Sequence, residues 1–243
     1  MQIRNENRRQ GRWVAEAIAA LLLVTLVGGG AASGQAPQVT PPQPTVPEVF
    51  TLQGQYVRIA YNNEGFASLG YRMAQDQIGK EWMLLEVGIT LRKPTPDSRL
   101  KREDLSITTP DGKTIPLATQ KEYSEGLGAV RNLTQRAKVI RDSIDYFPLE
   151  ADQVCAIQFF ADIGGAGHQL AFDEVELSWH RACLGRLFFR VPGGIQVGQH
   201  WLNIRFANSS LQVPFRTLTP DEEKQFRKHW EEIKKEHEKT LTQ

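Results

Sequence analysis

The chain has 243 residues, of which 40% are hydrophobic and 23% are charged, and its formal net charge at pH 7 is +1. These values are typical of a folded globular protein and exclude a disordered or a fibrous chain. The near balance of positive and negative charge also argues against a nucleic-acid partner, because nucleic acids are bound by an excess of lysine and arginine.

Residues 1–34 have the pattern of a secretory signal peptide. Four arginines precede the apolar run AIAALLLVTLV at residues 17–27, and small residues follow it. Ala32 and Gly34 provide the small side chains that signal peptidases require, which predicts cleavage before Gln35. The alternative is an uncleaved N-terminal membrane anchor, although the apolar run is only about half as long as a helix that spans a bilayer. In both cases we expect the following domain to be extracytoplasmic, either periplasmic or secreted.

Residues 35–47 contain five prolines and no charged residue, which predicts a disordered, proline-rich linker. In residues 48–217 hydrophobic and polar residues alternate in short runs, such as WMLLEVGITLR at 82–92. Turn signals separate these runs, among them Pro110-Asp111-Gly112, which predicts a hairpin. Roughly nine or ten such runs indicate a mainly β fold, and we expect a β-sandwich.

Residues 119–144 interrupt the strand pattern and predict a helical insertion. Thr119 and Glu122 have the spacing of a capping box, and hydrophobic residues then recur at intervals of three to four. We expect a helix from about residue 129 to 142 that covers one end or edge of the sandwich.

Residues 218–243 predict a C-terminal amphipathic helix. Thr219 and Glu222 form a second capping box around Pro220 at the first helical position. Phe226, Trp230 and Ile233 form an apolar stripe that is narrow for a core helix. We expect this helix to dock on the sandwich or on a partner.

Three segments occur in the order WMLLEVGITLR, TPDGKTIPL and LFFRVPGGIQVGQHWLNIRF. Behind an export signal and a low-complexity spacer, this order resembles the telokin-like, immunoglobulin-like domains of secreted and lipid-anchored bacterial proteins. The resemblance covers residues 50–215 and implies an immunoglobulin-like β-sandwich outside the cytoplasm. It carries over no catalytic residue, and the helical insertion and the C-terminal helix depart from the simple pattern.

The only two cysteines, Cys155 and Cys183, are predicted to form a disulfide bond. Export to an oxidising compartment favours the cross-link, and each cysteine lies on or beside the inward face of its predicted strand. The alternatives are two buried thiols, or a reactive Cys183 beside His180. We expect Gly185 to break the strand alternation, so that the cross-linked segment forms a bend between two strands.

The remaining sequence signals for chemistry are weak. The five histidines show no close metal-ligand spacing, so we expect no metal site and no cofactor. A glycine-rich loop without a phosphate-loop pattern is a candidate ligand loop, and its candidate residues are Gly164, Gly165, Gly167 and His168.

These signals favour a non-enzymatic β-sandwich protein that acts as an interaction or structural module for a protein or a component of the cell envelope. The candidate contact surface comprises Trp201, on the outward face of its strand, and the helix residues Phe226, Trp230 and Ile233. Trp201 packing under the C-terminal helix is the alternative. The rival functions are an extracytoplasmic enzyme whose site is assembled from distant residues, and an anchored accessory subunit of an envelope complex.

Overall fold

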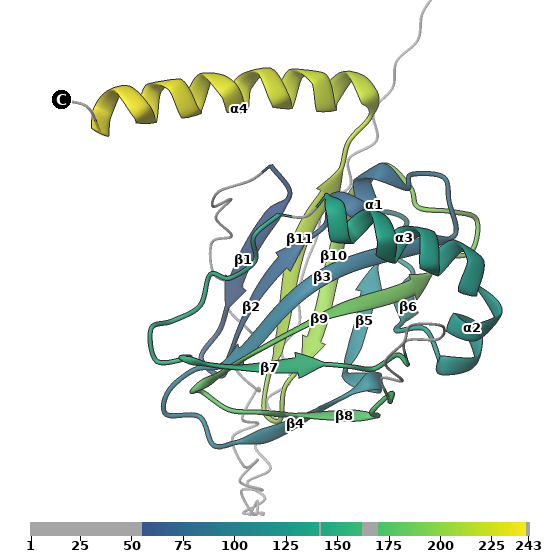
Figure 1. Ribbon diagram of the computed structural model, residues 1–243, viewed down its shortest axis with the longest axis vertical. Helices are drawn as coiled ribbons and strands as arrows, with labels where there is room; N and C mark the ends of the chain where they lie inside the picture. The colour runs from purple at the N-terminus through teal and green to yellow at the C-terminus, as the bar shows by residue number, and fades with distance from the viewer. Residues whose placement is uncertain (1–54, 141, 162–169, 242–243) are drawn as a thin grey trace, which may run out of the picture. The chain divides into compact units, whose positions relative to one another are not determined.

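A computed structural model of the protein describes residues 55–140, 142–161 and 170–241 (Figure 1). This part of the chain is mainly β, with short helices between strands and one long helix at its C-terminal end. Its strands are β1 (Val57–Tyr61), β2 (Gly65–Gly70), β3 (Trp82–Leu91), β4 (Ser98–Lys101), β5 (Leu105–Thr108), β6 (Thr114–Pro116), β7 (Gln153–Ile157), β8 (Glu174–Leu177), β9 (Arg181–Arg190), β10 (Gly198–Arg205) and β11 (Ser210–Thr217). Its helices are α1 (Arg72–Asp76), the 3-10 turn η1 (Arg102–Asp104), α2 (Gln120–Glu125), α3 (Leu127–Val139) and α4 (Pro220–Leu241).

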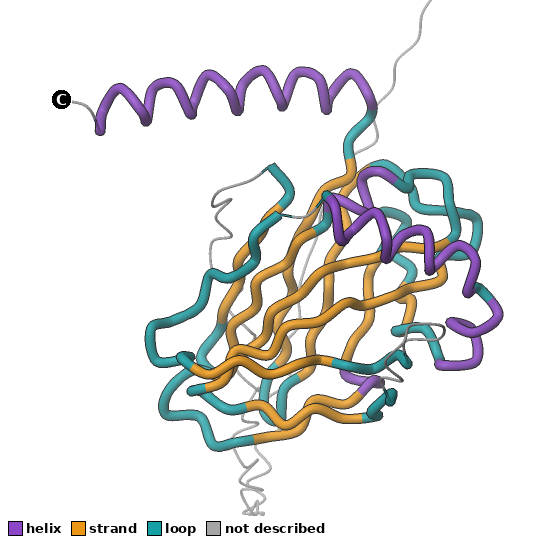
Figure 2. Tube along the Cα trace, in the orientation of Figure 1, coloured by secondary structure: helices purple, strands orange, loops and turns teal. Residues whose placement is uncertain are grey.

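The strands form three sheets (Figure 2). The largest has the order β1-β2-β3-β9-β7, the second has the order β11-β10-β5-β6, and β4 pairs with β8 alone. Neighbouring strands are antiparallel except for β7, which runs parallel to β9. β7 is therefore an edge strand whose only ladder partner among the described strands is β9.

The two larger sheets share one hydrophobic core, as the alternation along the strands predicts. Met83, Leu85 and Val87 of β3 have no exposed surface, and neither do Leu202 and Ile204 of β10. All five belong to one cluster of packed hydrophobic side chains. Burying a side chain of this size stabilises the folded state by about 1.5–3 kcal/mol.

Helices α2 and α3 and the segment that follows them cover the outer face of the five-stranded sheet, as Figure 1 shows for α3. Val130, Leu133 and Ala137 are buried, so the three- to four-residue spacing marks the packed side of α3. Further along the sheet, Phe147 occupies the space in which a side chain at Gly88 would lie. The outer face of this sheet is thus a second packed surface, and its residues are partly withdrawn from water.

Two details of the predicted strands and helices are wrong. The predicted helix at 129–142 begins earlier, at Leu127, ends at Val139 and is preceded by α2. The predicted bend at Gly185 is absent, because β9 runs without interruption through this glycine. A Cβ atom at Gly185 would lie 2.6 Å from the Cβ atom of Ile157, so the glycine allows β7 and β9 to approach closely.

The C-terminal helix α4 begins with the predicted capping box. Thr219 Oγ1 accepts a hydrogen bond from the Glu222 amide (3.2 Å), and the Glu222 carboxylate accepts one from the Thr219 amide (2.9 Å). The next residue, Glu223, accepts a hydrogen bond of 2.6 Å from the hydroxyl of Tyr56, near β1. Burial, together with the bond to Glu223 and its negative charge, raises the pKa of Tyr56. These contacts join the first turn of α4 to the five-stranded sheet.

Candidate binding groove

A groove of about 750 Å³ lies between the outer face of the five-stranded sheet and the helical cover. Strands β9 and β7 form its floor, and α3 and residues 142–145 form the opposite wall. Its volume is in the range of sites that bind small molecules or single side chains of a partner. We call it the β7 groove. Its lining residues are Glu86, Tyr123, Thr134, Lys138, Asp142, Ser143, Ile144, Asp145, Ala156, Ile157, Gln158, Phe159, Phe160, Leu184, Gly185, Arg186 and Phe188.

An ion pair lies on the floor of the β7 groove. Glu86 of β3 and Arg186 of β9 stand opposite each other in register, and Arg186 Nε lies 3.3 Å from Glu86 Oε1. Their neighbours Leu85 and Leu187 point into the core, so strand alternation directs both charged side chains to the outer face. The side chains of Glu86 and Arg186 are only 14% and 29% exposed. Charges that are partly removed from water need a partner, which explains why these two occur as a pair.

One wall of the β7 groove is aromatic. Tyr123 of α2 stacks on Phe160 with ring centroids 4.8 Å apart, and Phe188 of β9 meets both rings edge-on at 5.2 Å. The guanidinium group of Arg102 lies over the Phe160 ring at 4.8 Å. Burial lowers the pKa of Arg102, and the charge of Asp173 opposes this shift. The aromatic cluster fixes α2 against β9 and gives the groove an apolar side next to its ion pair.

Ion pairs and hydrogen bonds also hold the rim of the β7 groove in place. Asp142 accepts two hydrogen bonds from the guanidinium group of Arg72, at 2.6 and 2.9 Å. The bond to Asp142 raises the pKa of Arg72, although burial opposes the shift. Asp145 accepts a hydrogen bond of 3.2 Å from Ser143, and Lys138 is exposed at the end of α3. The bidentate pair fixes the chain where it leaves α3, so the rim does not depend on α3 alone.

The edge strand β7 borders the groove and leaves part of its backbone open. The amide of Gln153 donates to the carbonyl of His180, whereas the carbonyl of Gln158 accepts from the amide of Phe172 on the other side. Backbone groups of alternate residues point to opposite sides of a strand. Odd-numbered residues of β7 therefore face β9, and Val154 and Ala156 direct their N–H and C=O groups away from the sheet.

The predicted disulfide bond is confirmed and fixes this edge. Cys155 of β7 and Cys183 of β9 are register partners with Cα atoms 4.3 Å apart, and they are covalently linked. Cys183 is fully buried and Cys155 is half-buried against the core. The alternatives of two buried thiols and of a reactive Cys183 are excluded for this state of the protein. The bond is made by Cys155, which lies between Val154 and Ala156, the two residues with open backbone groups.

The predicted contact residues lie on two different elements, Trp201 on β10 and the other three on α4. Trp201 is half-buried and stands in register with Pro214 of β11 and Thr108 of β5. Phe226 and Trp230 are half-buried, and Ile233 is 42% exposed, all on α4. The hydrogen bonds that join α4 to the sheets come from its first turn and do not involve Trp201. A shared contact surface of Trp201 and α4 therefore stays a prediction.

The predicted ligand loop, with Gly164, Gly165, Gly167 and His168, lies outside the described residues. His180 Nδ1 lies 2.5 Å from Ser178 Oγ, and His200 is fully buried with its ring stacked on Phe215. Neither histidine lines the β7 groove.

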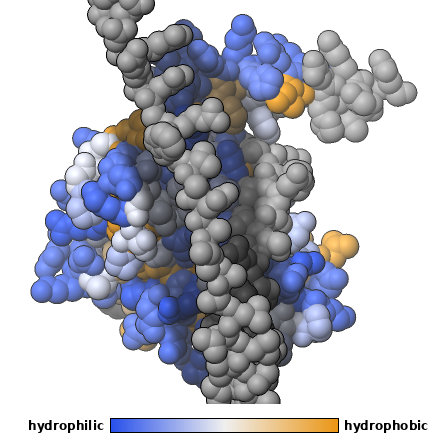
Figure 3. All heavy atoms as spheres, turned by 180° about the vertical axis from the view of Figure 1, so that it is seen from behind, coloured by the Kyte–Doolittle hydropathy of each residue, from blue (hydrophilic) through white to orange (hydrophobic). Residues whose placement is uncertain are grey.

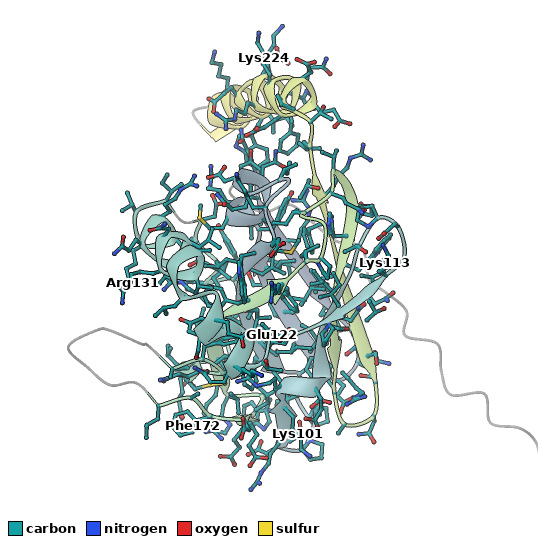
Figure 4. All side chains as sticks on the ribbon, turned by 90° about the vertical axis from the view of Figure 1, so that its right-hand side faces the viewer. Lys101, Lys113, Glu122, Arg131, Phe172 and Lys224 are labelled. Atoms are coloured by element: carbon teal, nitrogen blue, oxygen red, sulfur yellow. A yellow bond between two sulfur atoms is a disulfide. The ribbon has the colours of Figure 1, made fainter. Side chains whose placement is uncertain are left out.

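Residues 55–140, 142–161 and 170–241 contain no group of three or more His, Cys, Asp or Glu side chains that could hold a metal ion. Within the same ranges, no helix has both the length and the apolar character needed to cross a membrane. A second cavity, of about 510 Å³, lies along β6 and is lined by Lys113 and Glu122 among others (Figure 4).

The sequence did not reveal the β7 groove. Alternation placed Glu86 and Arg186 on outward strand faces, but only the register between β3 and β9 makes them partners. The usable signal was a charged residue in the middle of each of two long strands whose other interior residues are mostly hydrophobic. Covering such a charged residue with a helix removes it from water, which is unfavourable in free energy unless an opposite charge pairs with it.

Comparisons with known proteins gave no match to a protein-family model, to a curated protein or to a solved structure.

Proposed function

We propose that the protein is an extracytoplasmic, non-enzymatic binding module whose β7 groove receives part of a partner protein. The observation that carries this proposal is the pairing of an aromatic wall with a partly buried Glu86–Arg186 ion pair in one concave site. Sites that bind ligands are typically concave and mostly apolar, with a few fixed polar groups that orient the ligand. The groove is concave and combines an apolar aromatic wall with the fixed Glu86–Arg186 pair, and polar groups make up more of its lining than in such sites.

The rigidity of the site supports a binding role. The disulfide bond holds β7, the Arg72–Asp142 pair holds the rim, and the aromatic cluster holds α2. A site that is ordered before binding loses less conformational entropy when its partner arrives. The groove therefore suits recognition by a preformed surface.

The cross-link also supports the proposed location. Disulfide bonds persist in oxidising compartments, which is consistent with a periplasmic or secreted protein. We propose further that the two larger sheets form an immunoglobulin-like sandwich, related to the telokin-like domains that the sequence resembles. The shared core between the sheets supports this assignment.

The enzyme hypothesis has less support from the groove. Glu86 and Asp142, two of its carboxylates, are already engaged in ion pairs with Arg186 and Arg72. A general base needs a carboxylate or imidazole that is available to the substrate. The accessory-subunit hypothesis depends on residues 1–34, which lie outside the described residues.

Site-specific photocrosslinking tests the proposed function. A photoreactive benzoylphenylalanine at Lys138, on the rim, should yield a defined protein adduct in intact cells that export the chain. The same probe at Gln212, on the exposed side of β11, is the matched control and should not yield that adduct. Thr134→Trp, which fills the groove from α3, should abolish the Lys138 adduct. Equal adducts from both positions, or an adduct unaffected by Thr134→Trp, would refute the groove as the binding site.

A further inference from the structure

The uncovered hydrophobic residues of the described chain include a group around β7. Val154 on β7 is 76% exposed, and Leu170 and Phe172, beside the end of β7, are 71% and 54% exposed. Phe172 points outward in Figure 4. Viewed from behind, the described residues that are visible are mainly hydrophilic, with only separate hydrophobic ones (Figure 3). The edge of β7 thus combines open backbone groups with exposed apolar side chains.

Acidic residues surround this edge. Glu150 and Asp152 precede β7, and Asp173 follows Phe172; all three are exposed. Glu150 and Asp152 form no ion pair with a described side chain, whereas Asp173 interacts electrostatically with Arg102, and the neighbouring Glu174 and Glu176 are paired with Arg99 and Arg181. The edge therefore carries a surplus of negative charge.

Building on the proposed function, we propose that β7 accepts an additional strand from the partner: an extended segment in which basic and apolar residues alternate. Val154 and Ala156 provide four outward-directed backbone groups for its ladder. In such strand addition, backbone hydrogen bonds provide affinity and pockets for alternate side chains provide specificity.

The β7 groove would provide the pocket. Ala156 lines the groove and lies on the outer face of the sheet. Side chains of an added strand alternate between the two faces, so every second one would lie beside Val154 and Ala156 at the mouth of the groove. An apolar side chain there would meet the aromatic wall, and the exposed carboxylates of Glu150 and Asp152, just before β7, would attract the basic residues of the segment.

Charge distinguishes this partner from a second copy of the chain. Pairing of two β7 edges would add the flanking Glu150 and Asp152 carboxylates of a second copy to those already beside this edge. Charged residues along exposed edges are a common device against such self-pairing. A basic segment turns the same carboxylates into attractive contacts, and it is the occupant that the charges favour.

The test uses the full chain in its oxidised form and a capped peptide of alternating lysine and valine, with binding followed by fluorescence anisotropy. We expect binding that weakens as salt is added, because the acidic residues are exposed. The same peptide with alternate amides N-methylated should bind at least about tenfold more weakly, because it cannot complete the ladder. A peptide of alternating glutamate and valine should not bind.

Ala156→Pro should reduce affinity for the lysine–valine peptide by about tenfold, because it removes one outward N–H group and no bond to β9. Ala156→Ser keeps that group and is the matched control. Amide hydrogen exchange gives a direct readout: the Val154 and Ala156 amides should exchange quickly in the free chain and slow down with the peptide bound. The amides of Cys155 and Ile157 should be slow in both states.

Several outcomes would overturn the inference: no peptide binding, equal binding of the N-methylated or acidic peptide, or equal binding by Ala156→Pro. Dimers that Ala156→Pro abolishes would make a second copy the occupant and would also overturn it. Its failure is distinguishable from failure of the proposed function. A Lys138 adduct that is lost in Thr134→Trp but persists in Ala156→Pro would retain the groove and reject strand addition.

Discussion

Removal of the disulfide bond is the sharpest test of how the edge strand is held. In the variant Cys155→Ala/Cys183→Ala neither thiol remains. Any change in stability therefore comes from loss of the cross-link and not from reactions of free thiols. The bond joins two residues with a sequence separation of 28 and closes the chain between them into a loop. The loop-entropy relation assigns a loop of this size about 3–4 kcal/mol of stabilisation. A domain typically has a total stability of 5–15 kcal/mol, so we expect the variant to fold but to be much less stable.

Urea titration of the oxidised wild type and the double variant, followed by tryptophan fluorescence, measures this loss. The free energy of unfolding should fall by about 3–4 kcal/mol, and the melting temperature by roughly 6–16 °C. Wild type treated with reductant is the control, and it should lose a similar amount. The single variant Cys183→Ala should be somewhat less stable than Cys155→Ala, because Cys183 is fully buried and Cys155 is not.

The reasoning would be refuted by a loss below about 1 kcal/mol, since the loop-entropy relation predicts several times that value. It would also be refuted by two free thiols in wild type that is purified and denatured without reductant. A third refuting result is a loss that appears in the double variant but not in reduced wild type, because the substitutions themselves would then be responsible.

Three further predictions concern residues that support the same fold. Gly185→Ala should cost about 1–3 kcal/mol in urea titrations, because its Cβ atom would press on Ile157 and part β7 from β9; a neutral result would contradict that contact. Glu64 is buried and accepts hydrogen bonds from the Asn208 amide and the Ser209 hydroxyl, so Glu64→Ala should lower the unfolding free energy by about 1–3 kcal/mol and Glu64→Gln by less. Burial lowers the pKa of His200 from the ordinary 6.5, so the unfolded chain binds a proton at higher pH than the folded one. The free energy of unfolding should therefore show no loss from His200 above pH 6.5 and should decrease as the pH falls toward the folded pKa, by at most about 1.4 kcal/mol per pH unit. Unfolding titrations of His200→Phe between pH 5 and 7.5 should lack this decrease.

The local rules of the sequence predicted most of the secondary structure. Alternation located β3 and β10, because one face of each is buried in the core. The two capping boxes at Thr119 and Thr219 are both formed, because these bonds lie within four residues of each other along the chain. The disulfide bond was predictable because the chain has only two cysteines and the pattern of residues 1–34 predicts export to an oxidising compartment.

The parts that the sequence did not predict depend on contacts between distant segments. Gly185 indicates a break when β9 is considered alone, but the close approach of Ile157 from β7 explains it as an interior strand residue. In the same way, Glu86 and Arg186 are 100 residues apart and become partners only through the register of β3 and β9. The β7 groove is a product of this register and of the path that the chain takes from α3 to β7.

The position of the disulfide bond suits the binding edge that we propose as well as the stability of the fold. A short strand with a ladder partner on one side opens more readily than a central strand. The bond from Cys155 prevents β7 from separating at its middle residue, between Val154 and Ala156, whose backbone groups face outward. An edge that is held open and straight lowers the ordering cost for an incoming strand. The covalent link, the acidic flanks and the adjoining groove therefore all belong to the recognition surface that we propose.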